Sequence, residues 1–263
     1  MNSKYEILES IGVGSFGAVY KGRNKRTGEY VAIKIEPISN ETKLLKNESA
    51  IYQYLQNSPG IPLVRWFGKD KVNYYMVMDL LGDSLETLKK VKTSFSLKLT
   101  LQIGIQVLDL LMFIHDKSLI HRDIKPDNFL LGVNEKNNQL YIVDFGFCKC
   151  YMKNNKHISL GKTSKLIGSL SYASLNAHNN FELSRRDDIE SLCYMLIYLH
   201  LGKLSWQEYE DTNIQMMKID IINDISVPKI LIRFLSIVRN TGFEDRPQYL
   251  ELINLLNTEL VLL

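Results

Sequence analysis

The first third of the chain shows the residue pattern of short β-strands. β-Branched and aromatic runs at 5–7, 18–20 and 30–35 are separated by glycines, which predicts strands joined by tight turns. A further run at 73–81 predicts another strand. We therefore expect this part of the chain to form a small sheet.

One helical pattern interrupts these strands. Between residues 41 and 56, apolar side chains recur at helical spacing and define one face. Glu48 falls on that apolar face, where a carboxylate without a partner would be costly. We therefore expect Glu48 to point inward and to form an ion pair. The alternative is a Glu48 that faces solvent at the edge of the apolar stripe.

The rest of the chain is mainly helical in pattern. Segments 97–115, 186–200, 228–239 and 248–259 carry apolar residues at helical spacing. The predicted class is therefore α+β, with a small sheet-rich N-terminal lobe that contains one key helix and a larger, mainly helical C-terminal lobe. A cleft between such lobes is the expected place for a ligand.

Composition and charge narrow the class of protein. Of the 263 residues, 45% are hydrophobic and 23% are charged, as in folded domains. The formal net charge of +3 is too small to indicate a nucleic-acid or membrane partner. The most apolar run, 192–201, is shorter than the about 20 residues that a membrane-spanning helix needs. The N-terminal residues lack the layout of a secretory signal, so we expect a soluble, intracellular protein of the cytoplasm or nucleus.

The chain shows no internal repeat and no linker rich in Gly, Pro or Ser, so we expect a single domain over residues 1–263. Its three cysteines fit neither a disulfide framework nor metal-ligand spacing. We expect them to be small buried hydrophobic residues in a reducing compartment.

Residues 12–17 form the glycine-rich run Gly-Val-Gly-Ser-Phe-Gly. Dinucleotide-binding folds use this G-x-G-x-x-G spacing, but there the last glycine opens a helix. Here strand-like residues follow, which predicts a hairpin. Glycines at a hairpin tip let backbone N–H groups approach phosphates closely, although an ordinary glycine-rich hairpin is the alternative.

Lys34 is expected to face whatever this hairpin covers. Strand alternation points Val31 and Ile33 to one side, and therefore Ala32 and Lys34 to the other. The small Ala32 leaves room for a flat ring, and a buried ammonium needs a carboxylate partner. Glu48 is the candidate for that partner.

The run His-Arg-Asp-Ile-Lys-Pro-Asp-Asn at 121–128 carries the second set of candidate groups. Asp123 could accept the proton of a substrate hydroxyl, and Asn128 could offer an amide oxygen to magnesium. Lys125 supplies positive charge for a phosphate in transfer. His121, beside apolar residues, is expected to hold the loop rather than to move protons.

Asp144 begins an Asp-Phe-Gly run that follows a predicted strand at 140–143. Its carboxylate is the hard oxygen ligand that Mg²⁺ prefers, and Phe145 is expected to pack inward. An isolated Asp-x-Gly is usually only a turn. Here Asp144 lies 21 residues after Asp123, and this order and spacing favour a magnesium site formed by Asn128 and Asp144.

In this order the motifs resemble the protein kinase superfamily over essentially the whole chain. The loop at 121–128 matches the kinase pattern H-R-D-x-x-x-x-N. A lysine two positions after the aspartate is the pattern of serine/threonine rather than tyrosine kinases. The casein kinase I family is the most similar branch, on the stretches 60–62, 81–86, 121–130, 174–176, 184–192 and 204–207.

The resemblance implies a bilobal kinase fold, with an N-lobe over about 1–78, a hinge at 79–82 and a C-lobe over 83–263. It implies a serine/threonine kinase that uses ATP and Mg²⁺ and phosphorylates proteins. The catalytic residues would be Lys34, Glu48, Asp123, Lys125 and Asn128. The nucleotide would be held by Ile11, Gly12, Val13, Gly14, Ser15, Phe16, Gly17, Val19, Ala32, Lys34, Met78, Asp79, Leu80, Leu81, Leu130, Val143 and Asp144. The chain ends at about the last catalytic helix, so we expect no regulatory tail. With no clear activating phosphosite in the basic segment that follows Asp144, we also expect constitutive activity, and we expect a monomer.

Two positions depart from the family. Casein kinase I members resemble one another in an arginine that helps to hold the phosphate of a primed substrate, and Ser171 stands at that place. Many kinases pair a late arginine with the Glu of Ala-Pro-Glu, and Asn176 stands there instead. Arg246 therefore needs another partner.

The segment 145–181 contains no Asp or Glu but five lysines, at 149, 153, 156, 162 and 165. A local charge of +5 favours acidic or phosphorylated peptides as substrates, although a merely solvated loop is the alternative. With Ser171 in place of the arginine, we expect an acidic preference with only weak dependence on a priming phosphate.

Rival interpretations remain for the kinase-like chain. A pseudokinase binds or scaffolds without phosphoryl transfer, and it would usually lack at least one counterpart of Lys34, Asp123 or Asp144, all of which are present here. A kinase for small molecules would not be expected to carry the basic peptide-binding segment. A relative of the vaccinia-related or tau-tubulin kinases would differ only in substrate.

Overall fold

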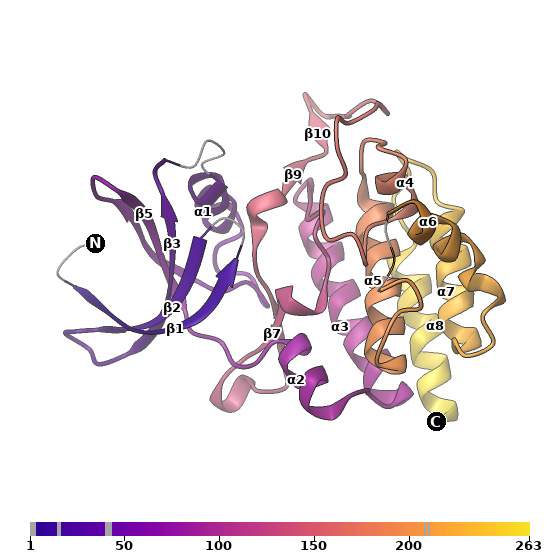
Figure 1. Ribbon diagram of the computed structural model, residues 1–263, viewed down its shortest axis with the longest axis horizontal. Helices are drawn as coiled ribbons and strands as arrows, with labels where there is room; N and C mark the ends of the chain where they lie inside the picture. Colours follow the sequence, from indigo (N-terminus) through magenta and orange to yellow (C-terminus); the bar gives the residue numbers. More distant parts are fainter. Residues whose placement is uncertain (1–3, 15–16, 40–43, 208, 210) are drawn as a thin grey trace. The chain divides into compact units, whose positions relative to one another are not determined.

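The computed structural model describes residues 4–14, 17–39, 44–207, 209 and 211–263. The chain divides into two compact units, whose elements are labelled in Figure 1. The N-terminal unit comprises Met1–Asp83 and Leu130–Gly146, and the C-terminal unit comprises Ser84–Phe129 and Phe147–Leu263. The short stretch after the 121–128 loop thus belongs with the sheet. The lobe boundaries that the resemblance implies stay a prediction.

An antiparallel sheet in the order β1-β2-β3-β5-β4 forms the N-terminal unit. The strand pattern predicted β1, β2, β3 and β5, but it did not predict β4. Gly14 at the end of β1 lies opposite Gly17 at the start of β2, so the expected glycine-rich hairpin is confirmed. A short pair, β7 and β8, accompanies this sheet. The bounds are β1 (Tyr5–Gly14), β2 (Gly17–Asn24), β3 (Tyr30–Pro37), β4 (Val64–Lys69), β5 (Asn73–Asp79), β7 (Phe129–Leu131) and β8 (Leu140–Ile142).

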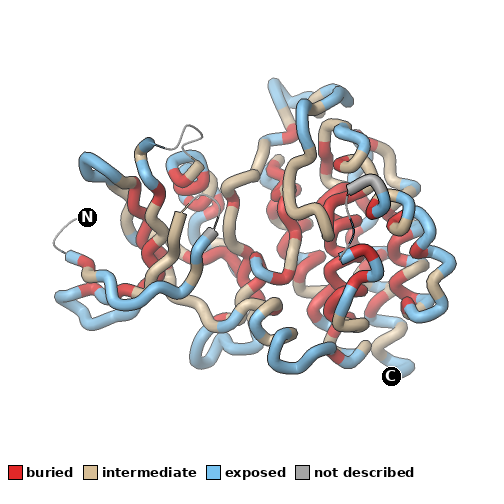
Figure 2. Tube along the Cα trace, viewed as in Figure 1, coloured by how far each residue is buried: buried red, intermediate tan, exposed pale blue. Residues whose placement is uncertain are grey.

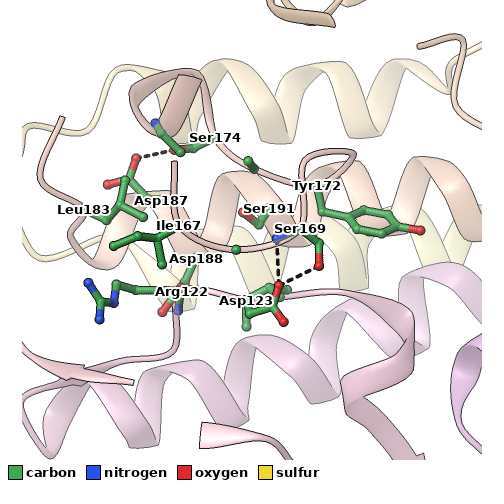
Figure 3. A pocket seen from close by; sticks show the side chains of 14 residues that line it. Arg122, Asp123, Ile167, Ser169, Tyr172, Ser174, Leu183, Asp187, Asp188 and Ser191 are labelled. Carbon is green, nitrogen blue, oxygen red and sulfur yellow. Dashed lines mark hydrogen bonds between the residues drawn. The ribbon is translucent and has the colours of Figure 1, made fainter. Parts of the chain in front are cut away.

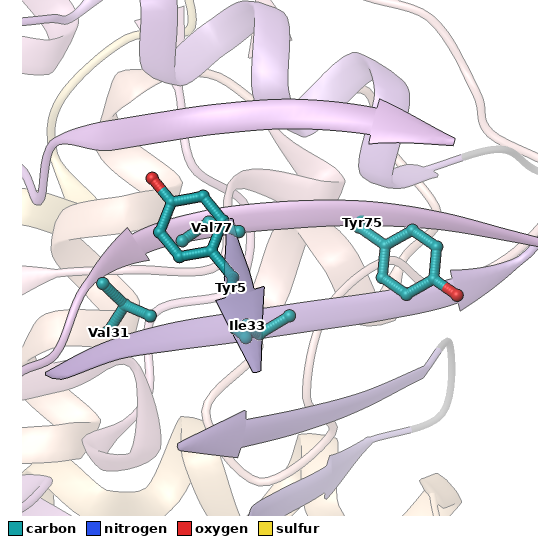
Figure 4. Close-up of a cluster of buried hydrophobic side chains, with 5 residues drawn as sticks. All are labelled: Tyr5, Val31, Ile33, Tyr75 and Val77. Carbon is teal, nitrogen blue, oxygen red and sulfur yellow. The ribbon is translucent and has the colours of Figure 1, made fainter. Parts of the chain in front are cut away.

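Side chains alternate along β3 as expected. Val31 and Ile33 lie in a buried cluster with Tyr5, Tyr75 and Val77 (Figure 4). Because neighbouring side chains of a strand point to opposite faces, Lys34 leaves the sheet on the other side from this cluster.

The helix α1 (Leu44–Tyr54) is tied to the sheet at its first turn. The buried carboxylate of Glu36, on β3, accepts the backbone N–H groups of Leu44 at 3.1 Å and Leu45 at 2.9 Å. These are donors that a helix leaves without intrahelical partners. Glu36 therefore ties the first described turn of α1 to β3, while the predicted start at residue 41 lies outside the described residues.

Helices dominate the C-terminal unit, as predicted. Their bounds are α2 (Leu85–Lys92), α3 (Leu97–Asp116), α4 (Leu175–His178), α5 (Arg185–Leu201), α6 (Asp211–Asp220), α7 (Lys229–Arg239) and α8 (Tyr249–Leu262). Single-turn helices occur at η1 (Pro126–Asn128), η2 (Asn134–Lys136), η3 (Phe145–Phe147) and η4 (Ile221–Asn223). Two short strand pairs join β6 (Leu119–Ile120) to β9 (Lys149–Cys150) and β10 (Met152–Lys153) to β11 (Lys156–His157).

The core of this unit is built around α5, which is buried along nearly its whole length (Figure 2). α3 packs against α5 and α8. By length and composition, α3 is apolar enough to cross a membrane. From the sequence, only the shorter run at 192–201 had been considered for such a helix. Half of its most apolar window is buried inside the protein, as in the core helix of a soluble domain.

The three cysteines are free, and the expectation that all are buried is wrong. Cys193 is buried in α5, but Cys148 is partly exposed and Cys150 is exposed. The latter two lie at and beside the two-residue strand β9, which is too short to bury both of its faces.

Gly202 ends α5 in a conformation that requires glycine. Its φ is +84°, and its N–H donates to the carbonyl of Tyr198 at 2.8 Å. A Cβ at this position would lie 2.7 Å from the carbonyl oxygen of Thr93. Both the backbone angle and the missing space oppose any other residue.

We expect Gly202→Ala to lower the free energy of unfolding by about 1–3 kcal/mol, because it adds left-handed strain and a steric clash. Chemical denaturation of both proteins measures the change. Gly161→Ala is the matched control, since nothing lies within 4 Å of its added Cβ. Equal stability of the two variants would contradict this role of Gly202.

Candidate active site

The predicted site residues fall into two groups, one on each unit. Lys34, Glu48 and Asp144 belong to the N-terminal unit, and Asp123 and the rest of the 121–128 loop to the C-terminal unit. Of the predicted nucleotide contacts, Ser15 and Phe16 lie outside the described residues.

Lys34 is held between two carboxylates. Its Nζ lies 2.8 Å from Glu48 Oε2 and 2.9 Å from Asp144 Oδ1. Glu48 points inward with 2% of its side chain exposed, so the structure contains the expected ion pair. Burial lowers the pKa of Lys34, but the charges of Glu48 and Asp144 outweigh it and raise that pKa above its ordinary value. Burial raises the pKa of Glu48 to about 7, against the opposing effect of Lys34.

Asp144 is fixed from both its backbone and its side chain. Its φ is +66°, a left-handed value that costs a non-glycine residue about 1–2 kcal/mol. Its N–H donates to the Tyr52 hydroxyl at 3.2 Å, and the Tyr52 ring meets Phe145 edge-on at 4.9 Å. Phe145 packs inward as expected, with 1% exposure. Tyr52 follows Glu48 by one helical turn, so α1 supplies both the carboxylate that pairs with Lys34 and the hydroxyl that binds the backbone of Asp144.

The other predicted nucleotide contacts lie along β1, β2, β3, β5 and β7 and in the segments that follow β5 and β8. Ala32 and Met78 are buried partners across β3 and β5. The Asp79 side chain is engaged by Arg65 at 2.8 Å and by the N–H of Leu63 at 3.1 Å. Asp79 could therefore contact a ligand only through its main chain. Val13, near the hairpin tip, is 83% exposed.

Asp123 is the centre of the second group (Figure 3). Its Oδ1 accepts the N–H and the hydroxyl of Ser169, both at 2.8 Å, and its Oδ2 lies 2.8 Å from Lys125 Nζ. Lys125 also donates to the Ser169 hydroxyl at 3.1 Å. The N–H of Asp123 donates to the ring of His121 at 3.3 Å, so His121 holds the loop as expected.

Ser169 is a functional candidate that the sequence reasoning missed. It lies 46 residues after Asp123, and a single serine in a loop carries no signal of such a contact. Gly168 beside it has φ +93°, and a Cβ there would lie 2.4 Å from the carbonyl oxygen of Arg122. This close approach brings Ser169 within reach of Asp123.

Asn128 is oriented to offer oxygen to a cation. Its Nδ2 donates to the carbonyl of Asp123 at 2.8 Å, which identifies Oδ1 as the atom for a ligand. Asn128 on the C-terminal unit and Asp144 on the N-terminal unit each offer an oxygen donor of the kind that Mg²⁺ prefers, so the chemistry of each side chain fits that ion. Among the described residues no three His, Cys, Asp or Glu side chains cluster to hold a metal. A Mg²⁺ held by either side chain would need further oxygen ligands, such as those of a phosphate.

Asp188, on α5, binds the backbone of the 121–128 loop. It accepts the N–H of His121 at 2.7 Å and that of Arg122 at 2.8 Å, and contacts the His115 ring at 2.9 Å. Burial raises the pKa of Asp188, but these partners outweigh burial and lower it below the ordinary value. Arg122 has φ +68°, and Asp188 secures the bend at this residue.

The neighbouring Asp187 explains one departure from the family pattern. It accepts hydrogen bonds from Ser174 at 2.7 Å, from Asn176 at 2.9 Å and from the N–H of Ser184 at 2.8 Å. Asn176 is thus bound to Asp187 rather than to an arginine. Arg246 instead forms an ion pair with Asp116 on the surface, at 2.9 Å.

The five lysines of the basic segment are not equivalent. Lys149 is paired with Glu182 at 2.8 Å, and Lys162 donates to the carbonyl of Asn179 at 2.8 Å. Lys153 and Lys156 are exposed and lie directly opposite each other in the β10–β11 hairpin. Lys165 is also exposed. Of the five, Lys149 has its charge balanced by an acidic partner, so the positive field at this surface comes from the exposed Lys153, Lys156, Lys162 and Lys165.

We expect the stability of this region to depend on pH through Asp187. Burial raises its pKa to about 6, so its contribution to stability is present in acid and is lost as the pH rises through about 6. Asp187→Asn removes this titration. From pH 4 to pH 7 the variant should gain up to about 3 kcal/mol of unfolding free energy relative to the wild type.

Denaturant titrations at several pH values measure this difference. The exposed Glu251, replaced in Glu251→Gln, is the control and should give a nearly constant offset from the wild type. An equally constant offset for Asp187→Asn would show that burial does not raise the pKa of Asp187 above its value in the unfolded chain.

The sequence pattern of the protein kinase domain family matches residues 5–253. This match includes the glycine-rich hairpin, Lys34 and Glu48, the 121–128 loop and Asp144. It agrees with the sheet and helix arrangement of the two units. The chain therefore belongs to the protein kinase domain family.

Proposed function

We propose that the chain is an active, ATP-dependent serine/threonine protein kinase of the casein kinase I type, working as an intracellular monomer. The observation that carries this proposal is Lys34 held at hydrogen-bond distance from both Glu48 and Asp144. Burying these charges is costly and brings no evident gain in packing. A chain that only used the fold as a scaffold would not need to retain them.

The N-terminal unit would bind the nucleotide. The β1–β2 hairpin would cover the phosphates with backbone N–H groups, and Lys34 would contact them with its ammonium. Ala32 leaves room for the adenine ring, and Ile11, Val19, Leu130 and Val143 would enclose it. The main chain of Asp79, Leu80 and Leu81 would pair with its polar edge.

Asn128 and Asp144 would hold Mg²⁺, which when bound neutralises and orients the phosphate oxygens. The C-terminal unit would direct the acceptor. Asp123 would orient a serine or threonine hydroxyl and accept its proton as the oxygen bonds to the γ-phosphorus. The bond from that phosphorus to the β-phosphate oxygen breaks, and ADP leaves.

Lys125 would stabilise the negative charge on the phosphoryl group in transfer. Its contact with both Asp123 and Ser169 supports this position. A lysine at this place is also the feature by which the loop resembles serine/threonine kinases.

The proposal predicts that Asp123→Asn and Asp144→Asn each lower phosphate transfer from labelled ATP to casein by at least about 10³-fold. Asp123→Asn should retain Mg²⁺-dependent binding of a fluorescent ATP analogue, because it lies outside the expected nucleotide contacts. Asp144→Asn should weaken that binding. Glu135→Gln, at an exposed position, is the control.

Equal labelling of casein by the wild type and Asp144→Asn would overturn the mechanism. A wild type that binds ATP but transfers no phosphate would instead identify a pseudokinase.

We also propose that the substrates are acidic or phosphorylated around the acceptor. The exposed Lys153, Lys156 and Lys165 support this preference, since like charges placed directly opposite, as in β10–β11, are unfavourable without anions nearby. Ser171 in place of an arginine argues against strict dependence on one priming phosphate.

The expected result is that Lys153→Ala with Lys156→Ala lowers kcat/KM for an acidic peptide by about 10-fold, with little change for a neutral peptide. Added salt should reduce the same preference in the wild type. Initial rates with acidic, neutral and primed peptides measure both effects. A large advantage for the primed peptide over the acidic one would contradict the proposed weak dependence on priming.

A further inference from the structure

Lys218 is a buried lysine that the proposed chemistry does not use. It lies near the end of α6 with 0% of its surface exposed. Its Nζ donates to the carbonyl oxygens of Leu170 at 2.9 Å and Ala173 at 2.7 Å, and lies 3.0 Å from His178 Nε2. Burying an ammonium is costly unless new contacts replace its water. These acceptors replace that water.

Two aromatic rings complete the surroundings of this ammonium. Its Nζ lies 4.8 Å from the ring centre of Tyr194 and 5.4 Å from that of Trp206. Aromatic faces attract cations most strongly where water is excluded. The Trp206 indole N–H also donates to the carbonyl of Ser171 at 2.8 Å. Lys218 and Trp206 together therefore hold the carbonyls of residues 170, 171 and 173.

The backbone of Lys218 is itself anchored. Its carbonyl accepts a hydrogen bond from Arg239, on α7, at 2.6 Å. The same Arg239 nitrogen donates to the Tyr194 hydroxyl at 2.9 Å, and that hydroxyl donates to Glu190 at 2.6 Å. Helices α5, α6 and α7 are linked in this way, so the position of the ammonium is set by the core of the unit.

The carbonyls that Lys218 holds belong to the turn that carries Ser169. The carbonyl of Ser169 accepts the N–H groups of Tyr172 and Ala173, both at 2.9 Å, which closes the turn. Lys218 joins the carbonyls of Leu170 and Ala173 across this turn. Ser169 donates from the same turn to Asp123 (Figure 3).

We propose that Lys218 is a positioning residue for phosphoryl transfer. It holds the turn 169–173 so that Ser169 keeps the Asp123 carboxylate oriented toward the substrate hydroxyl. The kinetic part of this inference rests on the proposed kinase function. The positioning part concerns only contacts within the C-terminal unit.

The test compares Lys218→Met, which removes both donors and charge, with Lys218→Gln, which retains N–H donors. Lys203→Met, at an exposed position, is the matched control. We expect Lys218→Met to lower kcat by about 10²-fold, as small displacements of reacting groups do, with the KM for ATP unchanged. Lys218→Gln should recover part of the loss, and Lys203→Met should resemble the wild type.

Amide hydrogen exchange of the nucleotide-free proteins tests the same idea without any activity. Exchange in the turn 169–173 should accelerate in Lys218→Met more than exchange in α5 or α7, and less so in Lys218→Gln. Cooperative unfolding shows whether Lys218→Met is folded. If it is not, Lys218→Gln is compared with the wild type instead, in both kcat and amide exchange.

A folded Lys218→Met with wild-type kcat and unchanged exchange at 169–173 would overturn the proposal. Uniformly faster exchange throughout the unit, with kcat lowered no more than by Lys203→Met, would also overturn it, because Lys218 would then serve stability alone. A wild type without transfer activity would contradict the proposed function. The exchange comparison would still decide the role of Lys218 in holding the turn.

Discussion

The buried charge of Glu48 constrains the arrangement of the whole N-terminal unit. Removing one partner from a buried ion pair costs about 3–5 kcal/mol, because the other charge is left without compensation. Lys34 must therefore stay on the face of β3 that α1 covers, and Glu36 holds the first described turn of α1 beside that strand. The register of the sheet, the position of α1 and the position of Asp144 therefore all depend on keeping Glu48 paired with Lys34.

Buried carboxylates perform a second task in the C-terminal unit, where they accept backbone N–H groups at bends. Asp188 binds the N–H groups of His121 and Arg122, and Asp187 binds that of Ser184. Each of these N–H groups lies outside the body of a helix or strand, so a side chain must satisfy it. The loop that carries Asp123 thus gains a defined shape from acids that take no part in the proposed chemistry.

The sequence predicted those elements and contacts whose residues conflict with their surroundings. A glutamate on an apolar helix face and a lysine in an apolar strand indicated the Lys34–Glu48 pair before the structure placed them together. The long apolar period of α3 gave nearly correct bounds, whereas the short, polar α2 and α6 were missed.

Contacts made by ordinary polar residues at long range could not be foreseen. Ser169 and Asp188 reach the 121–128 loop from 46 and 67 residues away. Nothing in the local sequence marks Ser169, and the resemblance at 184–192 singled out the stretch around Asp188 without indicating this contact. Lys218 has the pattern of a surface lysine on a polar helix, yet the packing of α5, α6 and α7 buries it completely. In each of these cases the tertiary fold decides the contact.

Arg122 and Asp144 share a further property, since both adopt left-handed backbone angles that glycine would tolerate better. Glycine could relax the backbone at either position, but it offers neither a guanidinium nor a carboxylate. At these two positions the backbone conformation would favour glycine, whereas the charged side chain requires another residue. Selection for thermal stability alone would therefore favour glycine at these two positions, so the retained Arg122 and Asp144 side chains indicate a requirement other than stability.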